Sequence, residues 1–162
     1  MPEPQKRIYI RLKPTKKPDP RSNAKHKNFN LREIALQGLF QMEVAHVPSE
    51  EIIKLEWVHS NLNDEERKFI EDLILGTAEL EIEIEKILQK YSKRNLETLS
   101  SIVRCVLKLG TYELLKGEFP GSIIIDSYCR LTRKYDDDHA VKYTNAILDK
   151  IYKFILQKQQ EN

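Results

Sequence analysis

One apolar pattern, with alternating intervals of three and four residues, constrains the fold of this chain more than any other feature. Its members are Ile70, Leu73, Thr77, Leu80, Ile84, Ile87 and Tyr91. Because an α-helix has about 3.6 residues per turn, this spacing places the seven side chains along one narrow face of a long helix. We therefore predict one helix from about residue 63 to about residue 91, opened by a capping box of Asn63 and Glu66, with Leu80 in its buried seam.

Helical periodicity continues on both sides of this segment, and no part of the chain has the pattern of paired strands. We predict further helices at about 30–46, after Pro48, at about 99–116, from about 122, and from the Asp136, Asp137 and Asp138 run to the C-terminal region. Gly117 is expected to end the fourth helix before Pro120. The sequence thus predicts an all-α fold in two small bundles, divided near residue 95.

The first 27 residues differ in composition from the rest and form a predicted N-terminal arm. Five of the seven prolines lie within the first 20 residues, where they favour extended backbone over helix. Residues 1–30 hold nine Lys or Arg against two acidic residues, whereas the remainder holds 18 basic and 23 acidic residues. A basic arm of this kind suits a polyanion, because Lys and Arg release counterions from phosphates. A tail that only aids solubility is the alternative.

Composition also excludes several classes of protein. No apolar run approaches the roughly 18 residues that span a bilayer, and no apolar secretion signal is seen, so we expect a cytoplasmic protein. Cys105 and Cys129 form no CxxC motif, and no metal site or cofactor is expected. The glutamates of residues 79–85 are expected to form a solvated helix face rather than an acid and base pair.

The segment from residue 25 to residue 41 joins the basic arm to an amphipathic helix. The apolar positions of this helix are Leu31, Ile34, Ala35, Gly38, Leu39 and Met42. Arg32, Glu33, Gln37 and Gln41 lie outside that stripe, so we expect them to be free to meet a partner.

Three blocks of sequence, in order, resemble the bacterial NusB family of transcription antitermination factors. They are REIALQGLFQ at 32–41, IVRCVLKLGTYELL at 102–115 and KYTNAILDK at 142–150. The resemblance covers about 28–154 and implies two packed three-helix bundles, at about 28–93 and 97–158. The basic arm of residues 1–27, which we expect to be flexible, is longer than the family commonly shows. The resemblance also implies an adaptor that is not an enzyme, pairs with the ribosomal protein NusE and binds boxA single-stranded RNA. The pair then joins an antitermination complex on RNA polymerase that serves ribosomal RNA transcription.

The resemblance, together with charge and ring chemistry, names two groups of site residues. The expected RNA-binding residues are Lys25, Lys27, Arg32, Lys142 and Tyr143, which offer cations for phosphates and a ring for a base. The alternative for Tyr143 is half-buried packing. The expected NusE-binding residues are Lys108, Tyr112 and Glu113, and their alternative is an ordinary exposed helix surface.

Two other functional readings stay open at this stage. One is a helical protein-interaction module that binds no specific RNA. The other is a stand-alone relative of the NusB-like domain of RNA cytosine methyltransferases, although the chain shows no glycine-rich cofactor loop and no cysteine nucleophile motif. The resemblance also leaves open whether the free protein is a monomer or a homodimer. Because lysine replaces much of the family's arginine before the first helix, we expect weaker RNA contacts there.

Overall fold

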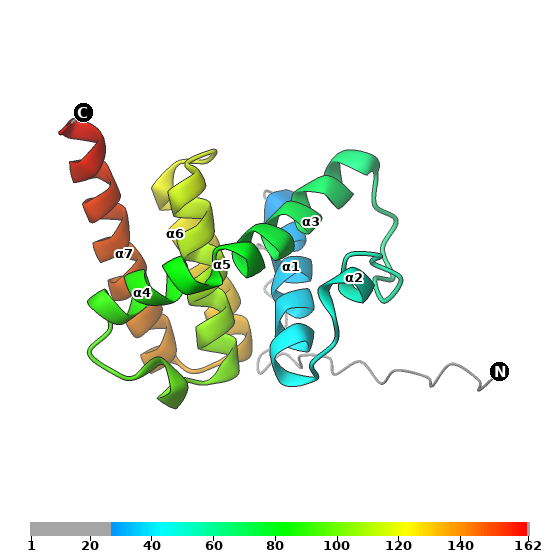
Figure 1. Ribbon diagram of the computed structural model, residues 1–162, viewed down its shortest axis with the longest axis horizontal. Helices are drawn as coiled ribbons and strands as arrows, with labels where there is room; N and C mark the ends of the chain where they lie inside the picture. The colour runs from blue at the N-terminus through cyan, green and yellow to red at the C-terminus, as the bar shows by residue number, and fades with distance from the viewer. Residues whose placement is uncertain (1–26, 162) are drawn as a thin grey trace.

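The computed structural model describes residues 27–161, and this part of the chain is built from helices without strands (Figure 1). The elements are α1 (Lys27–Val44), α2 (Ser49–Ile52), α3 (Asp64–Glu79), α4 (Glu81–Tyr91), the short 3-10 helix η1 (Leu96–Thr98), α5 (Ser101–Lys116), α6 (Gly121–Tyr135) and α7 (Asp138–Gln160). The all-α prediction is confirmed. The expected basic arm, with Lys25, lies outside the described residues.

Helix ends predicted from single residues form by local hydrogen bonds. The Asn63 side chain accepts from the Glu66 amide at 2.8 Å, and Glu66 accepts from the Asn63 amide at 3.1 Å, which completes the capping box of α3. Asp137 caps α7 by accepting from the Ala140 amide at 2.8 Å. Gly117 ends α5 in the left-handed conformation, with φ at 69°, as glycine allows.

Helix α5 is the centre of the molecule and packs against α1, α3, α4, α6 and α7. Helices α1 and α3 lie on one side of it, and α6 and α7 lie on the other (Figure 1). Its side chains are buried at eleven consecutive or nearly consecutive positions from Val103 to Leu114, so this helix has almost no exposed face along that length. A division of the chain into two units near residue 95 stays a prediction, since α5 contacts helices on both sides of that point.

The single long helix predicted for residues 63–91 is wrong at Leu80. Leu80 has φ −98° and ψ 17°, which separates α3 from α4, and its side chain is 38% exposed. Ile70, Leu73, Thr77 and Ile84 are buried as expected, whereas Ile87 and Tyr91 are half-buried. The break lets α3 pack on α1 and α5 while α4 packs on α5 and α7, so each half buries its own stripe. Leu80 stands at the junction and belongs to neither stripe.

Candidate nucleic-acid interface

Arg32, expected to meet RNA phosphate, lies in the interior of the protein. It is 1% exposed, and its Nε and Nη2 donate to the two carboxylate oxygens of Glu113 at 2.7 and 2.9 Å. Its Nη1 donates to Ser127 Oγ at 3.2 Å. The expectation that Arg32 is free for a partner is therefore wrong, and so is the expectation that Glu113 contacts NusE. The two residues bind each other and join α1 to α5 and α6.

The surroundings of this ion pair satisfy its remaining groups. The Tyr128 hydroxyl donates to Glu113 Oε2 at 2.5 Å, and the guanidinium carbon of Arg32 lies 5.0 Å from the ring centroid of Phe119. Burial lowers the pKa of Arg32, but the hydrogen bond and the charge of Glu113 outweigh burial and raise it overall. Burial and the carboxylate of Glu113 raise the pKa of the Tyr128 phenol well above its ordinary value. Arg32 thus keeps its charge inside the protein.

Lys108, also expected to contact NusE, is buried between helices. Only 4% exposed, it places Nζ at 2.6 Å from Glu43 of α1, and at 3.1 Å and 3.4 Å from Glu81 and Glu85 of α4. Burial lowers the pKa of Lys108, but its hydrogen bond to Glu43 raises that pKa above the ordinary value. The expectation that Lys108 is an exposed contact is therefore wrong, because its ammonium is buried and forms ion pairs with three carboxylates of neighbouring helices.

Tyr112 completes the correction to the expected partner surface. Its side chain is 9% exposed, and its hydroxyl donates to Asp72 of α3 at 3.0 Å. Its side chain lies so close to Gly76 that a Cβ added there would overlap Cζ and the hydroxyl oxygen of Tyr112. The expectation that Tyr112 anchors a partner is wrong. A polar spacing on α5 could not reveal its role, because this helix has neighbours on every side.

Lys142 and Tyr143 lie at the surface of α7, near the segment that follows α4. Lys142 is exposed and Tyr143 is half-buried. The Tyr143 hydroxyl forms a hydrogen bond with the hydroxyl of Ser92. The guanidinium carbon of Arg94 lies 5.8 Å from the Tyr143 ring centroid. The structure therefore combines partial packing of Tyr143 with an accessible cation next to its ring. Lys27 begins α1, and its side chain is outside the described part of the chain.

Arg94, which follows α4, is a further candidate that belongs to none of the motifs seen in the sequence. The turn holds it in place, since Ser92 Oγ donates to the Arg94 carbonyl at 2.7 Å and accepts from the Arg94 amide at 3.2 Å. Among residues 27–161, neither Arg94 nor Lys142 forms an ion pair with a carboxylate. Arg94, Lys142 and Tyr143 are called the Tyr143 cluster below. Two cations and a ring can contact phosphates and a base.

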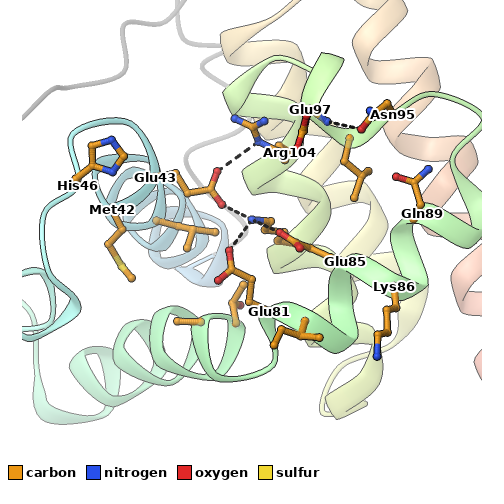
Figure 2. Close-up of a pocket in the computed structure, with 16 residues that line it drawn as sticks. Met42, Glu43, His46, Glu81, Glu85, Lys86, Gln89, Asn95, Glu97 and Arg104 are labelled. Atoms are coloured by element: carbon orange, nitrogen blue, oxygen red, sulfur yellow. Dashed lines mark hydrogen bonds and ion pairs between the residues drawn. The ribbon is translucent and has the colours of Figure 1, made fainter.

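A second feature is a cleft of about 740 Å³ between the C-terminal half of α1, the junction of α3 with α4, and α5 (Figure 2). Figure 2 shows Glu43, Glu81 and Arg104 directed into it, with Glu43 joined to Arg104 at 3.6 Å. Ile82 lines this cleft and is 67% exposed, the largest exposed fraction among the big apolar side chains of the described residues. Leu80, two positions earlier, is 38% exposed, so two large apolar side chains are exposed at the junction of α3 and α4.

Residues 27–161 hold no group of three or more His, Cys, Asp or Glu side chains placed to bind a metal ion. None of their helices combines the length and the apolar character that crossing a membrane requires.

Comparison with known proteins gives consistent results over the helical region. The family model described as NusB family matches residues 30–153. The transcription antitermination protein NusB of Syntrophomonas wolfei is 31% identical over 122 residues, which are 74% of this chain and 91% of that protein. The structure of T. maritima NusB has a TM-score of 0.72 at 28% identity, covering 77% of this chain and 89% of that one.

A crystal structure of antitermination factors NusB and NusE in complex with dsRNA also matches. Its TM-score is 0.73 at 22% identity, covering 80% of this chain and 98% of that chain, so it shows a shared fold. The family match spans most of the helices, and the Syntrophomonas wolfei protein aligns over nearly its whole length. The chain therefore belongs to the NusB family.

Proposed function

We propose that this protein is an RNA-binding transcription antitermination factor and not an enzyme. It binds boxA-type single-stranded RNA together with the ribosomal protein NusE and joins an antitermination complex on RNA polymerase in the cytoplasm. Membership of a family whose curated members are transcription antitermination proteins carries this proposal. The matching structure that contains NusB, NusE and dsRNA supports RNA and NusE as the partners.

The Tyr143 cluster is the proposed RNA contact within residues 27–161. Single-stranded RNA needs cations at its phosphates and flat side chains against its bases. Arg94 and Lys142 supply cations that no carboxylate of the described residues neutralises, and Tyr143 supplies the ring. Lys25 and Lys27 stay proposed phosphate contacts from the sequence. Arg32 is removed from this group, because Glu113 holds it inside the protein.

Fluorescence anisotropy with a labelled boxA RNA tests this function. We expect tighter binding with NusE present than without it. If about five phosphates are contacted, the logarithm of the affinity falls against the logarithm of salt concentration with a slope of about −3.5. Replacing Arg94 or Lys142 with Gln should make the slope less steep by about 0.7 for each lost contact.

Lys54→Gln is the matched control for these substitutions. Helix α2 lies at the end of the molecule opposite to α4 and α7 (Figure 1). Lys54 follows α2 closely in the chain, is exposed, and pairs with Glu51 at the surface at 3.8 Å. It should leave the slope unchanged. An RNA affinity that changes neither with salt concentration nor on addition of NusE would contradict the proposed function. Equal losses in Lys54→Gln and Lys142→Gln would contradict the assignment of the RNA contact.

The cleft lined by Ile82 is the proposed contact with NusE. Leu80 is 38% exposed and Ile82 is 67% exposed, so two large apolar side chains face solvent at the junction of α3 and α4. An interface of two proteins usually buries such groups at its centre, within a polar rim. The glutamates of the cleft supply such a rim here.

Ile82→Asp tests this assignment. The change places a charge at an already exposed position, so the free energy of unfolding should change by less than about 0.5 kcal/mol. Affinity for NusE, measured by titration calorimetry without RNA, should fall at least tenfold. Ile123→Asp, at a position of α6 that is 41% exposed, is the matched control and should keep full affinity. Unchanged NusE affinity in Ile82→Asp would contradict this surface. Ultracentrifugation of the free protein distinguishes monomer from homodimer.

A further inference from the structure

We propose that bound RNA continues along α7 beyond the Tyr143 cluster, to a second stacking point at the rings of Tyr91 and Phe154. Lys90, Lys150 and Lys158 would contact its phosphates there. This inference rests on the proposed RNA-binding function and extends it to a longer RNA than one held at Tyr143 alone.

The second stacking point joins α4 to α7, which lie side by side at one end of the molecule (Figure 1). The ring centroids of Tyr91 and Phe154 are 5.9 Å apart, and both residues are half-buried. The Lys90 Nζ lies 4.6 Å from the Phe154 centroid and 5.5 Å from that of Tyr91. The Lys158 Nζ lies 5.5 Å from the Phe154 centroid. Two cations thus stand over a pair of partly accessible rings.

Helix geometry aligns this point with the Tyr143 cluster. Tyr143, Lys150, Phe154 and Lys158 are separated by seven, four and four residues, so they lie along one face of α7. With a rise of about 1.5 Å per residue, Tyr143 and Phe154 are about 16 Å apart along the axis. Lys150 is exposed between them. The strip formed by Tyr143, Lys150, Phe154 and Lys158 of α7, with Lys90 and Tyr91 of α4 beside it, therefore alternates rings and cations along α7.

The lysine ammonium groups of this strip are available to contact a polyanion. Among the described residues, Lys90, Lys150 and Lys158 form no ion pair with a carboxylate. Between Tyr143 and Lys158 the helix carries one acidic residue, Asp149, which pairs with Lys153 at 2.9 Å.

An RNA strand can replace the contacts that the lysines make with the rings. A cation over a ring at an exposed site is a weak interaction, whereas a base stacked on an aromatic ring contributes more. The Lys90 ammonium can therefore leave the Phe154 ring for a phosphate while a base takes its place. Such stacking is tolerant of sequence, because every base has a flat face. The strip is accordingly expected to add affinity and length dependence without base selectivity.

The test compares a short boxA RNA with the same RNA extended by single-stranded nucleotides at its 5′ end or at its 3′ end. One extension should increase the affinity of the unaltered protein. The double substitution Lys90→Gln and Lys158→Gln should abolish that gain, leave affinity for the short RNA unchanged, and reduce the salt slope for the extended RNA by about 1.4. Phe154→Leu keeps an apolar side chain, and should weaken the extended RNA about fivefold to tenfold.

A 2-aminopurine base in the extension reports stacking directly. Its fluorescence should be quenched on binding to the unaltered protein and recover in Phe154→Leu. Lys153→Gln is the matched control, since it removes one positive charge from α7 away from the strip. The inference is overturned if neither extension adds affinity, or if Lys153→Gln loses as much as the double substitution. A loss of NusE affinity in the double variant without RNA would assign the strip to the protein partner instead. A protein that binds no boxA RNA refutes the proposed function as well.

Discussion

A charged residue on the polar side of a helical stripe need not face solvent, and Arg32 shows why. The apolar stripe of α1 marks one buried side, but α5 and α6 cover the side that carries Arg32. The cation is retained there because Glu113 accepts two of its hydrogen bonds and Ser127 a third. Apolar periodicity identifies buried apolar residues but cannot predict a buried ion pair, because its two members are 81 positions apart in the chain.

Arg32→Ala should destabilise the protein strongly. The substitution leaves the Glu113 carboxylate buried with the Tyr128 hydroxyl as its remaining donor, and breaking a buried ion pair in this way costs about 3–5 kcal/mol. Urea unfolding followed by circular dichroism measures the change. Arg130→Ala removes an exposed pair of α6, with Asp126 at 2.9 Å, and should cost less than about 0.5 kcal/mol. Equal stability of the two variants would contradict a structural role for Arg32.

Three tyrosines predict how the protein responds to alkaline pH. Burial raises the pKa values of Tyr112, Tyr128 and Tyr135 above the ordinary value, and the nearby carboxylates of Asp72, Glu113 and Glu33 raise them further. The folded state therefore keeps phenol protons that the unfolded state releases at about pH 10. The stability that these protonated phenols contribute is fully present below that pH and should be lost as the pH rises above it. Absorbance titration should show these phenols ionising only as the protein unfolds; early ionisation of all tyrosines in folded protein would contradict this.

At the scale of elements, the helix ends were more predictable than the paths of the helices. The caps at Asn63, Asp137 and Gly117 depend on residues within a few positions, so the local sequence contains all that they need. The break at Leu80 depends on which helices lie beside α3 and α4, and no local pattern records that. The same limit applies to the site. The resemblance proposes Lys142 and Tyr143, whereas Arg94 becomes a candidate only when its position beside the Tyr143 ring is known.

Two aspartate substitutions distinguish a helix break at Leu80 from one continuous buried face between residue 63 and residue 91. Leu80→Asp changes an exposed side chain at the junction and should alter the free energy of unfolding by less than about 0.5 kcal/mol. Ile84→Asp, at a fully buried position of α4, places an unpaired charge in the core and should cost more than about 4 kcal/mol. Thermal unfolding by circular dichroism compares them. A large loss of stability in Leu80→Asp would instead support the single helix, with one continuous buried face from residue 63 to residue 91.

At the scale of the whole molecule, α5 makes one structure of the helices on its two sides. Its residues bind α1 through Arg32 and Glu113, α4 through Lys108 with Glu81 and Glu85, and α3 through Tyr112 with Asp72. On the other side, Gly110 lies against Leu148 of α7, with 3.0 Å to the position of an added Cβ. The helices that carry the proposed RNA contacts and the proposed NusE contacts therefore pack on one central helix.

This arrangement predicts that the protein unfolds in one cooperative transition. Trp57 is the single tryptophan and packs on the α1 and α3 side, where its Nε1 donates to the Ile52 carbonyl at 2.9 Å. Its fluorescence reports that side alone, whereas far-ultraviolet circular dichroism reports all helices. Because unfolding of either side strips α5 of contacts that support the other, the two signals should give the same midpoint in urea. Separate midpoints would mean that the helices before and after residue 95 fold as independent units.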